Sequence, residues 1–298
     1  MNREPDLLAW IAERRILAGD GAMGTALQSA SLPPGGCPEA WNLERPEVIE
    51  AVMRGYVEAG AEILETNSFG GSPEKLAAYG LSARCAEINR AAAEIGSRAA
   101  GGRALVVGSI GSTGVLLDPL GPLGHEAAFE GFRRQAEALA EGGVSAFCVE
   151  TMIDLNEAIL AVGAAARTGL PVMGSMTFES TPRGFFTVMG ADVARSAREL
   201  EAAGACVVGT NCGTGPAGMI EIVRSLRSET RLPILVQPNA GIPLLLGDRV
   251  HYPETPEGFA SHVGAFVQAG ASVVGGCCGT TADHIRALGE EVRRIRGS

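Results

Sequence analysis

A repeated pattern, in which a helix-ending glycine is followed by a short apolar run, constrains the fold of this chain most strongly. It occurs at Gly60, Gly143, Gly204 and Gly270, each of which separates a helical segment from a run such as residues 205–209. Glycine is favoured just beyond a helix C-terminus because it readily adopts the left-handed backbone found there. Short apolar runs bounded in this way are typical of buried parallel strands. The pattern therefore predicts helices that alternate with the strands of a parallel sheet.

The alternation extends over the whole chain. Apolar runs predict eight strands, at residues 16–18, 62–65, 104–108, 146–149, 171–176, 206–209, 233–236 and 272–275. Helical patterns fill the intervals, at residues 46–60, 82–100, 125–142, 153–168, 190–203, 216–228, 255–269 and 281–296. Eight such units predict an α/β fold of the (β/α)8 TIM barrel type, as a single domain over residues 1–298. A short N-terminal helix at about 5–14 is expected to cover the bottom of the barrel, and irregular loops at 28–44, 110–124 and 239–254 to lie over its mouth.

The composition excludes several classes of partner. The net charge is −10 and no basic cluster occurs, which argues against nucleic acid and against an anionic membrane surface. No apolar run approaches the ~20 residues of a membrane helix, and the charged N-terminus does not resemble a signal peptide. We therefore expect a cytoplasmic protein. Its seven cysteines are expected to be reduced thiols or metal ligands rather than a disulfide framework.

Alignment of the repeats on their glycines places polar residues at strand ends. The seventh residue after the glycine is Asn67, Glu150, Asn211 or Cys277. Cys212 and Cys278 come one position later in the last two repeats. The C-terminal ends of the strands form the catalytic face of barrel enzymes. The cysteines of strands six and eight are therefore expected to share one mouth.

Cys212 and the adjacent pair Cys277-Cys278 indicate a metal site. Adjacent cysteines cannot readily form a disulfide with each other, and the flanking glycines allow both thiols to turn toward one point. Three sulfur ligands with an open fourth position are typical of catalytic zinc. Zinc held by three thiolates binds an incoming thiol and lowers its pKa, which favours attack on an activated methyl group. The alternative, that these three cysteines are small buried hydrophobes, is disfavoured. Such a packing role is expected instead for Cys85, Cys148 and Cys206. No role is expected for Cys37.

Strands one and four end in residues suited to the amino-acid end of a substrate. The glycine-rich segment 19–25 precedes a helix start, so its amides can hold a carboxylate. Asp20 and Glu150 can together hold an ammonium group. Alternatives stay open for both residues, since Asp20 can be a helix N-cap and Glu150 one half of a buried ion pair.

At these residues the chain resembles the zinc-dependent homocysteine S-methyltransferases over nearly its whole length. The resemblance rests on segments 20–25, 65–70, 111–114, 150–151, 210–212, 238–241 and 275–281. The last of these, Gly275-Gly276-Cys277-Cys278-Gly279-Thr280-Thr281, is highly specific in combination with Cys212. The chain looks closest to the homocysteine-binding module of cobalamin-dependent methionine synthase, and is more distantly similar to the betaine and S-methylmethionine enzymes.

The resemblance implies that Cys212, Cys277 and Cys278 bind zinc. It also implies that Asn239 fills the fourth position until the sulfur of homocysteine displaces it. The family's pocket for the amino-acid end corresponds to Asp20, Ala22, Met23, Asn67, Glu150 and Asn211. The product is then methionine.

The methyl donor is left open by the resemblance. Segment 65–69 favours a methylcorrinoid, with cobalamin carried by a separate small corrinoid protein. S-methylmethionine or S-adenosylmethionine fits a stand-alone enzyme, while betaine is less favoured because only Trp41 and Tyr252, among the tryptophans and tyrosines, fall in rim loops to form a cage. Two alternatives involve no catalysis at the cysteines: a zinc- or thiol-binding subunit of a larger methyltransferase, and a phosphate-binding loop at 275–281.

Overall fold

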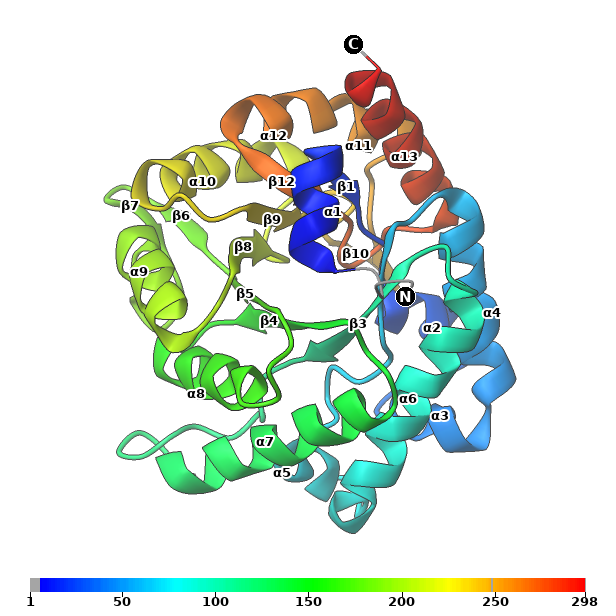
Figure 1. Ribbon diagram of the computed structural model, residues 1–298, viewed down its shortest axis with the longest axis vertical. Coiled ribbons are helices and arrows are strands. Elements are labelled where there is room, and N and C mark those ends of the chain that lie inside the picture. Colours follow the sequence, from blue (N-terminus) through cyan, green and yellow to red (C-terminus); the bar gives the residue numbers. More distant parts are fainter. Residues whose placement is uncertain (1–5, 248, 298) are drawn as a thin grey trace.

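Eight parallel strands curve into one barrel (Figure 1) in the computed structural model, which describes residues 6–247 and 249–297. The strand order is β1-β12-β9-β8-β5-β4-β3-β2. The strands are β1 (Leu17–Ala18), β2 (Ile63–Glu65), β3 (Leu105–Ile110), β4 (Ala146–Met152), β5 (Val172–Met176), β8 (Val207–Asn211), β9 (Ile234–Gln237) and β12 (Ala271–Val274). Each overlaps a predicted strand, so the predicted TIM barrel is confirmed. The predicted domain of 1–298 includes residues 1–5, 248 and 298, which lie outside the described residues.

Hydrogen bonds close the barrel between β1 and β2, the two ends of the strand order. The N–H of Glu62 donates to the carbonyl of Ala18 (2.7 Å). One step further along, the N–H of Glu65 donates to the carboxylate of Asp20 (2.8 Å). The Asp20 side chain thus continues the backbone ladder, and this bond fixes its position at the mouth.

Helices surround the barrel (Figure 1). They are α4 (Pro46–Ala59), α6 (Cys85–Ala100), α7 (His125–Glu141), α8 (Leu155–Ala166), α9 (Val193–Ala203), α10 (Pro216–Glu229), α11 (Pro256–Ser261), α12 (Val263–Ala269) and α13 (Ala282–Arg296). Helices α4, α9 and α12 end at Gly60, Gly204 and Gly270, whose φ angles are 107°, 113° and 109°. The predicted helix-ending glycines are therefore confirmed at these three positions, and Gly143 (φ 96°) follows Gly142, the C-cap of α7. The predicted helix at 255–269 is divided at His262.

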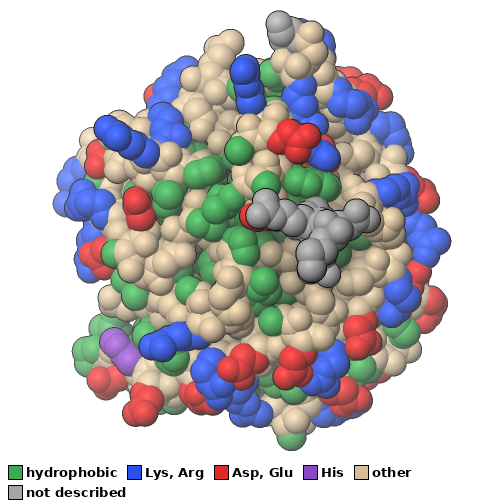
Figure 2. Space-filling model, in the orientation of Figure 1, with side chains coloured by type: hydrophobic (Ala, Val, Ile, Leu, Met, Phe, Trp, Pro, Cys, Tyr) green, Lys and Arg blue, Asp and Glu red, His purple; other side chains and the backbone are tan. Residues whose placement is uncertain are grey.

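Helix α1 (Leu7–Arg14) covers the bottom of the barrel, as the sequence predicts. Leu7 and Ile11 are buried in a cluster with inward-facing strand residues such as Leu17 and Ile63. Figure 2 shows this face, where acidic and basic side chains are interspersed over the surrounding helices. Within residues 6–247 and 249–297, no helix has both the length and the apolar character required to span a membrane.

Short elements occupy the loops over the mouth. They are α2 (Met23–Ser29), α3 (Trp41–Glu44), α5 (Pro73–Ala77), η1 (Ser82–Arg84) and the hairpins β6 (Glu179–Thr181)–β7 (Gly184–Phe186) and β10 (Leu244–Leu246)–β11 (Arg249–His251). The prediction of wholly irregular loops at 28–44 and 239–254 is therefore wrong where α3 and the β10–β11 hairpin form. Long-range contacts stabilise such short elements, for example the bond from the Asn42 amide to the carbonyl of Asn67 (2.8 Å).

Candidate active site

A cavity of about 300 Å³ lies among the C-terminal ends of the strands. Two sets of side chains line it, and we name them here. The thiol cluster is Cys212, Cys277 and Cys278, and the carboxylate cluster is Asp20, Glu65 and Glu150. Among the described residues that line the cavity there is no Lys, Arg or His. The cavity therefore suits a cation, and its acidic lining argues against the phosphate-binding alternative for segment 275–281.

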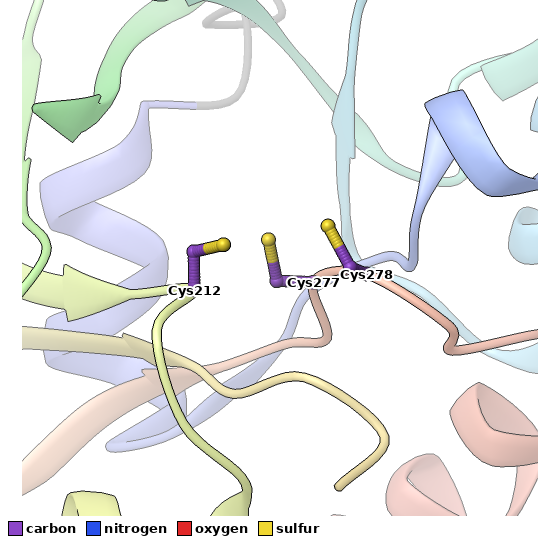
Figure 3. A group of neighbouring side chains, drawn as sticks. All are labelled: Cys212, Cys277 and Cys278. Atoms are coloured by element: carbon purple, nitrogen blue, oxygen red, sulfur yellow. The ribbon is translucent and has the colours of Figure 1, made fainter. Parts of the chain in front are cut away.

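The three sulfur atoms of the thiol cluster lie within 4.8 Å of one another. Cys212 stands at the end of β8, whereas Cys277 and Cys278 follow β12, and the Cys212 sulfur points toward Cys277 (Figure 3). All three residues are partly buried. The thiols thus meet at one mouth, as the alignment of the repeats predicts. This arrangement offers three soft ligands to one metal ion.

Cys212 is aimed at the cavity by a left-handed backbone. Its φ is 59°, and Thr151, at the same position of another repeat, has a φ of 57°. This conformation costs a non-glycine residue about 1–2 kcal/mol, and such strain clusters at functional sites. Hydrogen bonds hold both residues, since the Cys212 N–H donates to the carbonyl of Gln237 (3.0 Å) and the Thr151 N–H to Oδ1 of Asn211 (2.8 Å).

The loops that follow β9 and β12 are joined by backbone hydrogen bonds. The N–H of Cys277 donates to the carbonyl of Pro238 (2.8 Å), and the N–H of Ala240 donates to the carbonyl of Cys278 (2.9 Å). These two bonds flank Asn239 on one loop and hold the cysteine pair on the other. The arrangement makes Asn239 part of the same unit as the thiol cluster.

Asn239 has an unsatisfied buried oxygen beside the thiols. Its side chain forms a hydrogen bond with the Cys212 sulfur, which helps to lower the pKa of that thiol. The residue is 3% exposed, and its Oδ1 has no hydrogen-bond partner among the described residues. A buried polar atom without a partner calls for a ligand or an ion. Asn239 is therefore placed to supply the oxygen of a fourth metal ligand.

Charge is unequally shared within the thiol cluster. Hydrogen bonds from Cys277 and Cys278 lower the pKa of the Cys212 thiol to about 3. The same bond to Cys212 raises the pKa of Cys278 to about 11 and raises that of Cys277. The cluster alone thus favours a single thiolate. Ionisation of all three thiols requires a bound cation, so that metal binding releases protons.

Tyr252 contacts the thiol cluster from the loop after β11. Its hydroxyl lies within hydrogen-bond reach of the Cys278 sulfur, and burial raises its own pKa. The ring packs directly on Gly279, where a Cβ would clash with it and where φ is 82°. The glycine is thus required both for the turn and for the approach of Tyr252.

The carboxylate cluster has no cationic partner among the residues that the structure describes. Glu150 Oε1 accepts from the Ser109 hydroxyl (2.6 Å), and Oε2 accepts from the Asn211 amide (3.3 Å). No ion pair among residues 6–247 and 249–297 includes Glu150, so the alternative of a buried ion pair is wrong. Burial raises the pKa of Asp20 and of Glu150. The N-cap of α2 is Ala22, without a side-chain bond, so the N-cap alternative for Asp20 is also wrong.

The other predicted pocket residues differ in what they offer to a ligand. The N–H of Ala22 donates to the Thr280 hydroxyl (3.1 Å), so this amide is engaged within the protein. Met23 begins α2, which has no side-chain cap. Both residues line the cavity. Of the two amides, that of Met23 is the better candidate for a substrate carboxylate.

Asn67 and Asn211 support the site from within the protein. Asn67 lines the cavity, but its amide nitrogen donates to the carbonyl of Pro38 (2.8 Å). Asn211 lies behind the cavity wall, where its amide nitrogen reaches Glu150 (3.3 Å) and the Cys277 sulfur (3.9 Å). Asn211 thereby connects the two clusters.

Glu65 and Gln237 are site residues that the sequence reasoning did not single out. Glu65 comes five positions after Gly60, two before Asn67. Side chains two apart on a strand share a face, so Glu65 points into the barrel like Ile63, which lies in the interior cluster of β2 and its neighbours. The amide of Gln237 donates to its carboxylate (3.0 Å). A search for acidic residues at every inward position near the strand ends would have found Glu65.

The remaining cysteines lie outside the thiol cluster. Cys37, Cys85 and Cys148 are buried, and Cys206 is partly buried with its sulfur against the carbonyl of Val172 (3.4 Å). The expected packing role of Cys85, Cys148 and Cys206 agrees with these positions.

Comparison with known proteins identifies the family. The family model described as Homocysteine S-methyltransferase matches residues 17–292. This chain belongs to the homocysteine S-methyltransferase family. The predicted family is thus confirmed.

Curated and solved members of the family resemble the chain over different shares of their length. Methionine synthases of Mycobacterium leprae and Mycobacterium tuberculosis are each 35% identical to it over 310 and 312 residues. These matches cover 98% of this chain but 25% and 26% of the relatives, so the chain spans about a quarter of their length. The metallated form of the homocysteine methyltransferase MmuM from Escherichia coli is 25% identical, with a TM-score of 0.80, over 95% of this chain and 99% of that chain.

Proposed function

We propose that this protein is a zinc-dependent homocysteine S-methyltransferase that forms methionine. The observation that carries the proposal is the position of the thiol cluster and the carboxylate cluster on one cavity. A substrate with a thiol at one end and an ammonium group at the other matches these two clusters. The similarity to a homocysteine methyltransferase that was solved in a metallated form supports the same conclusion.

The residues present fit a zinc ion. Three cysteine sulfurs favour zinc over the hard cations magnesium and calcium, and Asn239 brings an oxygen that lacks a partner. Bound zinc would lower the pKa of the homocysteine thiol and so supply a thiolate nucleophile at neutral pH. The chain's own part is to hold Cys212, Cys277 and Cys278 in place through the strained backbone and the paired loops. Asn239 would hold the ion through its side-chain oxygen when no substrate is bound.

The carboxylate cluster would bind the amino-acid end of the substrate, on the side of the cavity opposite the thiol cluster. Asp20 and Glu150 would accept hydrogen bonds from the ammonium group, because the described residues that line the cavity offer them no cation. The amide of Met23 at the start of α2 would hold the substrate carboxylate. Homocysteine is thereby oriented with its sulfur toward the thiol cluster, and a methyl donor must approach from the open mouth.

A methylcorrinoid carried by a separate protein or segment is the donor that the mouth favours. The loops after β3, β7 and β9 expose large apolar side chains: Leu116, Leu120, Val188, Met189, Ile242, Leu244, Leu245 and Val250. Exposed apolar side chains on loops that follow the strands are typical of a surface that contacts another macromolecule. A small hydrated donor such as S-methylmethionine, S-adenosylmethionine or betaine would not need such a surface.

A small donor remains the second candidate because of one observation. The match to MmuM covers 99% of that chain, which is therefore a homocysteine methyltransferase of similar extent. A third candidate is a zinc- and thiol-binding subunit without activity of its own. It would bind homocysteine but would form no methionine with any small donor.

One assay separates these candidates. The zinc-loaded protein is incubated with homocysteine and, in parallel, methylcobalamin, S-methylmethionine, S-adenosylmethionine or betaine, and methionine is measured. We expect turnover with methylcobalamin, and its loss in Cys212→Ala but not in Cys206→Ala, a cysteine outside the cluster. Turnover with S-methylmethionine, S-adenosylmethionine or betaine but not with methylcobalamin would show that the donor is a small onium compound. Binding of homocysteine without turnover on any donor would indicate the non-catalytic subunit.

A further inference from the structure

The carboxylate cluster contains one more acid than is needed to hold an ammonium group between Asp20 and Glu150. The additional group is Glu65, at the end of β2. Its carboxyl lies within hydrogen-bond reach of that of Glu150 and accepts from the Gln237 amide (3.0 Å). Two carboxylates in such contact repel each other unless a proton lies between them.

The described groups around Glu65 offer no source of positive charge. Asp20 approaches from the end of β1, bound to the N–H of Glu65 itself (2.8 Å). Cys148 and Glu150 approach from β4 and Gln237 from β9. Tyr56 of α4 interacts with Asp20 on the far side. Since the described lining of the cavity contains no Lys, Arg or His, a proton is what neutralises the pair in the empty cavity.

We propose that Glu65 is a positioning residue whose carboxyl shares one proton with Glu150 in the empty cavity and loses it when the ammonium group of homocysteine binds. The inference rests on the proposed function, because it assumes that the substrate is an amino acid. The ammonium group keeps its three protons, and the displaced proton passes to the buffer. Two carboxylates with one ammonium group then carry the same net charge as the protonated pair did before.

The direction of the pH dependence follows from this exchange. Burial and the charge of Asp20 raise the pKa of Glu65 to about 7. The pKa of Glu150 is raised well above its ordinary value by burial and by Glu65, so the pair still holds a proton above pH 7 and the substrate must displace it. The affinity for homocysteine therefore rises with pH until this shared proton is lost. In Glu65→Gln the amide can still donate to Glu150, while the like charge that favours the shared proton is gone. The part of the pH dependence that comes from the shared proton should therefore disappear.

Proton counting by calorimetry tests the inference. L-Homocysteine is titrated into zinc-loaded protein at pH 6 and pH 8, in buffers that differ in ionisation enthalpy. Binding of the thiol as thiolate releases at most one proton, because the free thiol pKa is ~8.5. We expect the wild type to release the shared proton in addition to that of the thiol at both pH values, and Glu65→Gln to release about one proton fewer than the wild type. Glu39→Gln is the matched control, since Glu39 lines the same cavity but accepts from the Gly70 N–H (2.7 Å).

The possible results separate the two proposals. Release of no more than one proton by the wild type at pH 6 would overturn the role of Glu65, and this measurement does not depend on any variant. A second proton that persists in Glu65→Gln, or disappears equally in Glu39→Gln, would also overturn it. Failure of homocysteine to bind the zinc-loaded wild type would instead contradict the proposed function.

Discussion

The two sides of the cavity are built in different ways. The thiol cluster comes from two strand ends, and hydrogen bonds between the backbones of the two loops hold the Cys277-Cys278 pair. The carboxylate cluster takes one acid from each of three strands, and side-chain bonds from Ser109, Asn211 and Gln237 hold it. The thiol side is thus fixed by backbone conformation and by backbone hydrogen bonds between neighbouring loops. The carboxylate side depends on the register of the whole barrel and on protonation.

This difference suggests that the two sides fail in different ways. Loss of a thiol removes one of the three sulfur ligands of the metal ion. Loss of a carboxylate weakens the hold on one end of the substrate but leaves the reacting sulfur in place. Substitutions on the two sides should therefore affect different kinetic constants.

Cys212→Ala should have the largest effect. Removal of one of three sulfur ligands should lower zinc content to near zero after dialysis and reduce methyl transfer by more than ~100-fold. Metal analysis and the rate of methionine formation measure the two quantities. Cys206→Ala, on the same repeat but outside the cluster, should retain one zinc per chain. A Cys212→Ala protein with full zinc content would show that the thiol cluster is not the zinc site.

Glu150→Gln tests the other side of the cavity. The loss of a charged partner for the ammonium group should raise the KM for homocysteine by ~10- to 100-fold, with kcat changed much less because the contact exists in ground and transition states alike. Zinc content should be unchanged. A fall in kcat with a normal KM would show that Glu150 acts on the thiol side, and the distinction between the two sides would fail.

Asn239→Ala should have an effect that depends on the substrate. Without homocysteine the zinc ion loses its fourth ligand, and its affinity should fall by ~10-fold. With homocysteine bound, the substrate sulfur occupies that position and the difference should largely vanish. Competition with a chelator, in the presence and absence of homocysteine, measures this. An equal loss of affinity in both conditions would mean that Asn239 only supports the loop.

Tyr252→Phe should have the smallest effect. It removes one hydrogen bond to the Cys278 sulfur and keeps the ring on Gly279, at a cost of about 1 kcal/mol in zinc affinity. The same chelator competition measures it. A change as large as that of Cys212→Ala would indicate that Tyr252 is itself a ligand.

The sequence predicts the backbone of the barrel and the thiol side well, for a physical reason. Helix-ending glycines and short apolar runs are local signals, and they give the strand ends and hence the meeting of Cys212 with Cys277. The β6–β7 and β10–β11 hairpins lack such signals, because their strands are three residues long and mostly exposed.

The carboxylate side was predicted only in part, because its interactions are distant in sequence. The Ala22 amide is taken by Thr280, 258 residues away, so no local pattern could reveal it. Glu65 was missed because the alignment marks the seventh position after each glycine, whereas this residue is at the fifth and faces the same interior. Its role depends on the register between β2, β4 and β9, which sequence periodicity does not specify.

X-ray absorption at the zinc edge, before and after addition of homocysteine, tests the central claim most directly. We predict one zinc per chain with three sulfur neighbours and one oxygen neighbour, and four sulfur neighbours once homocysteine is bound. A sulfur count that stays at three when homocysteine is saturating would contradict the claim that the thiol cluster and the substrate thiol meet on one metal ion.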